Sequence, residues 1–244
     1  VRFIKQNRID GEILIVENGS RDKTGKLLGD LQKKYSILRV INLSVANKGI
    51  ALKEGLKNAI GKHLITLDTD LWDAKFASES IKYLKEYDVV VGSKTISGAS
   101  DNRPLASRLM NIGYNFLMKL IFNFQGTDTH AKLAFKKDSI LPLVDQCLTQ
   151  DLVFDTELIL RAERTGLRKI EIPTSATEVR PRVYSIGTQL RKTIKNTWVL
   201  IKSLGITPHW PYLILLFALA LGMFLRFYHF RDWFFFEVDE EHYA

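Results

Sequence analysis

The sequence predicts an α/β domain, with a mostly parallel β-sheet and flanking helices, followed by a single membrane-spanning helix. Three observations support this fold class. Short apolar runs bounded by turn residues alternate with segments whose apolar residues recur at helical spacing, as expected for a parallel sheet connected by helices. The 244 residues are 46% hydrophobic and 25% charged, which is typical of a globular chain. A continuous apolar stretch then follows Pro211.

The first part of the chain contains four predicted strands separated by three predicted helices. Each strand is a short apolar run that ends at turn-forming or polar residues. The first helix carries Leu27, Leu28 and Leu31 at helical spacing, and the second carries Leu52 and Leu56 on one face. The strands are predicted at 12–16, 37–43, 63–67 and 88–92, and the helices at 22–35, 50–60 and 76–87.

The alternation of predicted strands and helices is less regular beyond Gly92. Residues 93–103 are polar and lack a period, which predicts a long loop. We expect the basic helix at the end of the domain either to lie on a membrane surface or to pack against the domain. The predicted elements are an apolar or amphipathic segment at 105–124, an edge strand at 132–135, a helix at 154–165, a strand at 167–173 and the basic helix at 186–204.

Charge and cysteine content narrow the function classes. The formal net charge is +8, which suits an anionic membrane surface or phosphorylated substrates. No recognition helix, zinc pattern or aromatic RNA-binding motif accompanies this charge, so nucleic acid is not an expected partner. Cys147 is the only cysteine, which excludes an internal disulfide and a cysteine-rich metal site.

Residues 210–229 predict one membrane-spanning helix. Flanking Trp, Tyr and Phe residues extend an apolar core to about the twenty residues that a span needs. Basic residues precede this stretch and acidic residues follow it, so the positive-inside rule places the large domain in the cytoplasm. A buried core helix is the alternative. We therefore expect a domain over 1–204, and a linker, the span and the start of an extracytoplasmic loop over 205–244.

The strongest local signal is Asp68-Thr69-Asp70, at the end of a predicted strand. In the turn beyond the strand both carboxylates can converge on one ion, and their oxygens suit Mg²⁺ or Mn²⁺ with positions left for diphosphate oxygens. Ligands of open α/β sheets bind beyond the carboxyl ends of the strands, where this pair falls. We predict Asp68 and Asp70 as metal ligands and catalytic residues; a solvated loop is the alternative.

Two further polar turns, residues 17–24 and 47–49, follow the first two predicted strands at the same sheet edge. Acid, amide and hydroxyl groups there can bind a base or ribose, and glycine permits a tight turn. A plain turn with a helix cap is the alternative for each. The predicted nucleotide-sugar-binding residues are Glu17, Asn18, Ser20, Asn47, Lys48, Gly49, Asp68 and Thr69.

In their combined order these motifs resemble the inverting glycosyltransferases of the GT-A fold, in the branch of dolichol-phosphate mannose synthase and related polyprenyl-phosphate hexosyltransferases. Residues 17–24 are similar to the family's Asp-Asp-Gly-Ser-x-Asp-x-Thr turn, and residues 67–71 to its Leu-Asp-Ala-Asp-Leu segment. The resemblance implies a Rossmann-like sheet whose first strand precedes Val1. Further similar segments are 47–55, 90–94, 154–158 and 171–173.

The resemblance also implies the reaction, transfer of mannose or glucose from a GDP- or UDP-sugar to dolichyl or undecaprenyl phosphate. A lipid phosphate is already anionic, so this acceptor needs no protein base. Departures from the family pattern at Asn18, Val183 and Ile186 leave the donor open. Basic side chains match phosphate oxygens, and the candidates to hold the acceptor phosphate are Lys94, Arg103, Arg108, Arg180, Arg182 and Ser185.

Two other functions stay open at this level. Transfer to a hydroxyl group would need a base, for which Asp155 and Glu157 are the candidates. The second open function is that of a non-catalytic nucleotide-binding module of a membrane complex. We expect His130 to make a structural hydrogen bond rather than complete a metal site. The tail, Arg226 to Tyr243, resembles the start of multi-spanning glycosyltransferases of the protein O-mannosyltransferase type.

Overall fold

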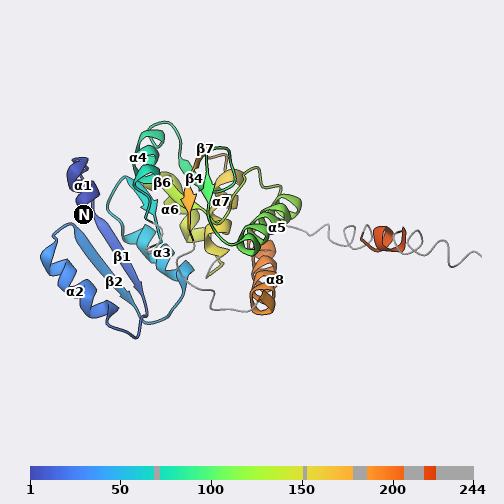
Figure 1. Ribbon diagram of the computed structural model, residues 1–244, viewed down its shortest axis with the longest axis horizontal. Coiled ribbons are helices and arrows are strands. Elements are labelled where there is room, and N and C mark those ends of the chain that lie inside the picture. The colour runs from blue at the N-terminus through green and yellow to red at the C-terminus, as the bar shows by residue number, and fades with distance from the viewer. Residues whose placement is uncertain (69–71, 151–152, 178–185, 206–216, 224–244) are drawn as a thin grey trace, which may run out of the picture. The chain divides into compact units, whose positions relative to one another are not determined.

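The computed structural model describes residues 1–68, 72–150, 153–177, 186–205 and 217–223 (Figure 1). The chain divides into two compact units, Val1–Ile206 and Thr207–Ala244. In the second unit, residues 217–223 are helical. Among the residues described, no helix combines the length and apolar character that crossing a membrane requires. Most of the predicted span at 210–229, and the whole tail that follows it, lie outside these residues.

The first sheet of the larger unit is a pair of parallel strands, β1 (Ile13–Asn18) and β2 (Leu38–Leu43). The connection between them runs through α2 (Thr24–Lys34), which packs on β2, as expected for a parallel crossover. Beyond β2, α3 (Lys48–Asn58) packs against β1. The short α1 (Arg2–Gln6) precedes these elements (Figure 1).

The second sheet has four strands in the order β3-β6-β4-β7. Its strands are β3 (His63–Thr66), β4 (Val89–Ser93), β6 (Lys132–Lys136) and β7 (Lys169–Pro173). β6 runs antiparallel to both β3 and β4, whereas β4 and β7 are parallel. This sheet is mixed, but β3, β4 and β7 run in the same direction and only β6 opposes them, so the described strands are mostly parallel, as predicted.

The prediction of β6 as an edge strand is wrong, since β6 lies between β3 and β4. Its consecutive residues Leu133, Ala134 and Phe135 are all buried. A strand that is apolar on both faces has no side that tolerates solvent, which is the physical reason for its central position.

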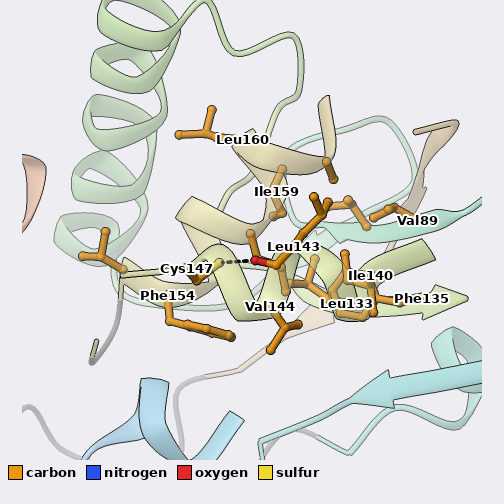
Figure 2. Close-up of a cluster of buried hydrophobic side chains, with 14 of the residues drawn as sticks. Val89, Leu133, Phe135, Ile140, Leu143, Val144, Cys147, Phe154, Ile159 and Leu160 are labelled. Carbon is orange, nitrogen blue, oxygen red and sulfur yellow. Dashed lines mark hydrogen bonds between the residues drawn. The ribbon is translucent and has the colours of Figure 1, made fainter. Parts of the chain in front are cut away.

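Helices cover both faces of this sheet. The face of Val89 and Val91 packs in the main core with α6 (Lys137–Gln146) and α7 (Phe154–Arg164), which Figure 2 shows in part. The intervening Val90 faces the opposite side, where Phe76 and Leu84 from α4 (Ala74–Tyr83) and its cap form a smaller cluster. The alternation of core contacts along β4 follows from the two-residue period of a strand.

The remaining elements frame the ends of the sheet. Within the predicted loop, β5 (Ser100–Asp101) pairs with β8 (Ser175–Ala176). The long α5 (Leu105–Phe122) begins after Pro104 and ends at Asn123, whose φ of 56° is left-handed. The last helix described in this unit is α8 (Ile186–Ser203). The predicted strands and helices are present with shifted ends, whereas α6, which contains Pro142, was not predicted.

Candidate active site

A cleft opens where β3 and β4 end, between the first turns of α3 and α7. Its empty volume, counted out to open solvent, is about 560 Å³. Segments from six elements line it, so residues far apart in the sequence meet there. The charged or titratable residues of its lining are Lys48, Asp68, Lys94, His130, Lys132 and Asp155.

The centre of the cleft is a lysine between two carboxylates. Lys48 Nζ lies 3.1 Å from Asp68 Oδ1 and 3.7 Å from Asp155 Oδ2. Lys48 is on the first turn of α3, which begins at Asn47, whose side chain accepts a hydrogen bond from Ile50 N. Burial works to lower the pKa of Lys48, but Asp155 and Asp68 together outweigh it, and the pKa is raised. The ammonium therefore stays charged at neutral pH.

The two carboxylates differ in their surroundings. The Asp68 side chain is 46% exposed and reaches the cleft from the end of β3. Asp155 lies in the first turn of α7 and is buried. Burial raises the pKa of Asp155 to about 6, and Asp68 adds to this rise while Lys48 opposes it. Asp155 is thus a carboxyl group that can exchange a proton near neutral pH.

A second buried ion pair lies on the β4 side of the cleft. Lys94 Nζ is 2.7 Å from Asp128 Oδ2 and also donates to the carbonyl oxygen of His130. Asp128 is fully buried and in addition accepts hydrogen bonds from Lys94 N and His130 N. Burial lowers the pKa of Lys94, although Asp128 opposes the change. Lys94, which is predicted to bind the acceptor phosphate, therefore lines the cleft, and its ammonium group is paired with Asp128.

The predicted polar turns after β1 and β2 are bonded to each other. Asn18 Oδ1 accepts from Asn47 N at 2.6 Å. The Glu17 carboxylate accepts from the backbone N–H groups of Gly19 and Ser20, and these bonds, together with one from the Ser20 side chain, lower the pKa of Glu17. Gly19 has a φ of 69°, and a Cβ there would lie 3.2 Å from Val45 C, so the turn requires glycine.

Of these turn residues only Lys48 is part of the cleft lining. Ser20 is exposed, and Gly49 is buried within α3. The turns lie at one edge of the β1–β2 pair, since Asn18 and Leu43 end the two strands in register. Thr69 and Asp70, the latter a predicted metal ligand, lie outside the described residues.

Neither of the predicted phosphate-binding arginines that the structure describes lines the cleft. Arg103 forms a bidentate pair with Asp101 at 2.7 and 2.8 Å, and Arg108 is exposed on α5. The other candidates, Arg180, Arg182 and Ser185, lie outside the described residues.

The prediction of Glu157 as a candidate catalytic base is wrong. Glu157 is fully buried and does not line the cleft. Its carboxylate accepts hydrogen bonds from Leu148 N, from Thr149 N and Oγ1, and from Arg161. These bonds and one from Ser203 outweigh burial and lower the pKa of Glu157. Glu157 therefore holds the chain before α7 in place.

The residues that sequence reasoning missed are Lys132 and Asp73. Lys132 Nζ lies 2.8 Å from Asp73 Oδ2 and also donates to Thr174 Oγ1 and to Ser175 O. Asp73 also caps α4 by accepting from Phe76 N at 2.9 Å. This pair joins the segment after Asp68 to β6 and to the end of β7. The signal in the sequence was an aspartate that precedes a helical pattern.

No group of three or more His, Cys, Asp or Glu side chains able to hold a metal ion occurs in the part of the chain that is described. The exposed carboxylate of Asp68 is nevertheless a donor of the kind that Mg²⁺ and Mn²⁺ take. His130 lines the cleft, and its ring packs edge-on against Tyr114 with 4.8 Å between ring centroids.

Comparisons with known proteins agree with this picture. A family model described as glycosyl transferase family 2 matches residues 2–141. The chain is 27% identical over 167 residues to glycosyltransferase AglD of Haloferax volcanii, covering 66% of this chain and 27% of that protein. It is 25% identical over 205 residues to a dolichyl-phosphate beta-glucosyltransferase of Trichomonas vaginalis, covering 79% and 62%. The chain thus spans less than two thirds of either relative.

Among solved structures, the chain resembles glucosyl-3-phosphoglycerate synthase from Mycobacterium tuberculosis, in a complex with Mn²⁺, uridine diphosphate and glucosyl-3-phosphoglycerate. The TM-score is 0.59 at 15% identity, over 82% of this chain and 72% of that one. A complex of the same enzyme with Mn²⁺ and UDP-glucose gives a TM-score of 0.56 at 15% identity, over 79% and 68%. The likeness supports the predicted GT-A-like α/β fold.

Proposed function

Because this chain belongs to glycosyl transferase family 2, we propose that it transfers a hexose, mannose or glucose, from a GDP- or UDP-sugar to a polyprenyl phosphate with inversion at the anomeric carbon. The observation that carries the proposal is the cleft in which Lys48 lies between Asp68 and Asp155. The enzyme class, a glycosyltransferase, follows from the family, which speaks against the non-catalytic scaffold alternative. The name of the Trichomonas relative supports a lipid-phosphate acceptor.

The donor would bind along the turns that follow β1, β2 and β3. A hydrogen bond joins Asn18 and Asn47 at these turns, and the next residue, Lys48, lines the cleft. Complexes of the structural neighbour with UDP and UDP-glucose support a nucleotide-sugar in this fold. The same complexes contain Mn²⁺ and support a divalent ion, for which Asp68 and Asp70 would be the ligands.

Transfer forms a bond between an acceptor oxygen and the anomeric carbon, and breaks the bond from that carbon to the β-phosphate oxygen. Negative charge develops on the departing diphosphate, and fixed cations directed at it lower the barrier. Lys48 is charged at neutral pH and faces the same space as Asp68. A bound divalent ion would add Lewis-acid stabilisation of the same charge. Lys94 and Lys132 also line the cleft, each in an ion pair with an aspartate, Asp128 and Asp73 respectively.

We further propose that residues 210–229 span a bilayer, with the domain on the cytoplasmic side and the acidic end outside. The apolar stretch with its aromatic flanks, and the basic residues that precede it, support this arrangement. Such an anchor would keep the cleft close to a lipid acceptor that stays in the membrane.

The second candidate is transfer to a hydroxyl group, with Asp155 as the base. The observation in its favour is the buried Asp155 carboxyl group, whose pKa of about 6 suits proton abstraction near neutral pH. With a phosphate acceptor, the same residue would instead keep Lys48 in position.

The experiment offers the chain labelled GDP- and UDP-hexoses with either polyprenyl phosphate or polyprenyl alcohol, and extracts the product into organic solvent. We expect transfer to the phosphate alone. We expect Asp70→Asn to lower the rate of transfer by about a thousandfold, the scale of a lost charge-stabilising group. The control is Asp145→Asn, which removes a surface carboxylate paired with Lys57 and should leave the rate unchanged. Efficient transfer to the alcohol would select the second candidate, and no transfer with any donor would overturn both.

A further inference from the structure

The helix α5 buries Met118 and Phe122 in the core, yet it also exposes large apolar side chains on its outer face, unlike an ordinary surface helix. Its buried face includes Asn111 and Asn115, which are 9% and 4% exposed. Five large apolar residues on its outer face are between 54% and 67% exposed. These five residues, called the apolar stripe below, are Leu105, Leu109, Ile112, Phe116 and Leu120.

The apolar stripe is continuous along the helix. Its members are spaced by three or four residues, so at 100° per residue they fall within an arc of about 80°. From Leu105 to Leu120 the stripe is about 22 Å long at 1.5 Å per residue. A single exposed leucine needs no explanation, but an uninterrupted row of this length indicates a binding surface.

Charge on α5 has one sign. Its sequence contains no acidic residue, and its charged residues, Arg108 and Lys119, are both exposed. These cations are eleven residues apart, just over three full turns, so they lie on the same flank of the apolar stripe. The other exposed residues of the helix are apolar or glycine. Protein interfaces have a polar rim with regular hydrogen bonds, whereas apolar residues flanked only by cations suit an anionic lipid surface.

The opposite face of α5 packs next to the cleft. Tyr114 contacts the ring of His130, a cleft-lining residue, and its hydroxyl lies 3.4 Å from Thr156 Oγ1. Asn115 Oδ1 accepts from both N and Oγ1 of Thr129. A surface that touches the apolar stripe is therefore separated from the cleft by about one helix diameter, roughly 10 Å.

We propose that the apolar stripe of α5 docks on an anionic lipid bilayer, with Arg108 and Lys119 against the headgroups. Docking would place the cleft where the phosphate of a membrane lipid can enter it while the lipid tail stays in the bilayer. Only this last consequence rests on the proposed acceptor; the docking itself rests on the residues of α5.

Site-specific fluorescence tests the proposal on the full chain. The only native cysteine, Cys147, is buried, and burial raises its pKa to about 12, so a thiol-reactive bimane label would select an introduced cysteine. Phe116→Cys carries the label in the apolar stripe, and Ile60→Cys is the matched control, an isoleucine 72% exposed between α3 and β3. Vesicles of phosphatidylcholine and phosphatidylglycerol contain a brominated lipid that quenches only labels in contact with acyl chains.

We expect severalfold quenching at position 116 and none at position 60, with weaker quenching in vesicles of phosphatidylcholine alone. Absent quenching at 116, or equal quenching at both positions, would refute docking. A shift of the emission at 116 with protein concentration and no lipid would assign the face to a second copy and overturn the proposal. Transfer activity in detergent is measured separately, so a failed docking result and a failed transferase result are distinguishable.

Discussion

Lys48→Met removes the cation between Asp68 and Asp155 and so tests the electrostatics of the cleft. At 3.7 Å, with an effective dielectric constant of about 20, one charge pair is worth about 4 kcal/mol, or about three pKa units. The lysine side chain is 31% exposed, so solvent screening reduces this effect. We expect the pKa of Asp155 to rise from about 6 to between about 7 and 8.

Carbon-13 NMR titration of the aspartate carboxyl groups, with Asp155→Asn to assign the signal, measures this pKa directly. The matched control is Lys57→Met, a lysine of the same helix that pairs with the surface residue Asp145. In the transferase assay, a base role for Asp155 would move the acid limb of the pH profile upward by the same amount. An Asp155 signal that titrates unchanged, or at lower pH, in Lys48→Met would refute this reading of the cleft.

Three further predictions concern stability in urea. Glu157→Gln should cost about 3–5 kcal/mol, because it leaves the partly buried Arg161 and several N–H groups poorly paired; exposed Glu86→Gln should be neutral. Gly92→Ala should cost about 1–3 kcal/mol, since its Cβ would lie 2.8 Å from an aromatic ring carbon. Hydrogen bonds, the strongest from Lys132, outweigh burial and lower the pKa of Asp73. The stability that the ionised Asp73 contributes should therefore be lost as the pH falls and this carboxyl group is protonated. Asp73→Asn should flatten this acid limb of the stability curve.

Local pattern predicted the elements well because each depends on neighbours in sequence. Val89, Val90 and Val91 form a buried strand wherever it lies, and Asp73 and Asn47 cap their helices through bonds to residues three positions later. The order of strands depends on distant partners. The apolar run that ends at Phe135 fits a central strand, but it does not say that the neighbours of β6 are β3 and β4, so its partners could not be inferred from periodicity.

The same distinction applies to the site. Asp68 was found because it directly follows a strand, but its contact with Lys48, and that of Lys48 with Asp155, join segments remote in sequence. Asp155 and Glu157 satisfied the same helix-start pattern. Residues two apart on a helix point about 200° from each other, so only one could face the cleft, and tertiary packing decided which.

The end of α8 is attached to the helix that carries Asp155. Arg161 Nη2 donates to Ser203 O and Oγ, and Arg164 Nη1 donates to Leu204 O at 2.8 Å. These guanidinium groups occupy carbonyl groups that a helix terminus would otherwise leave to water. The helix that carries the buried Asp155 therefore also fixes the last turn of α8.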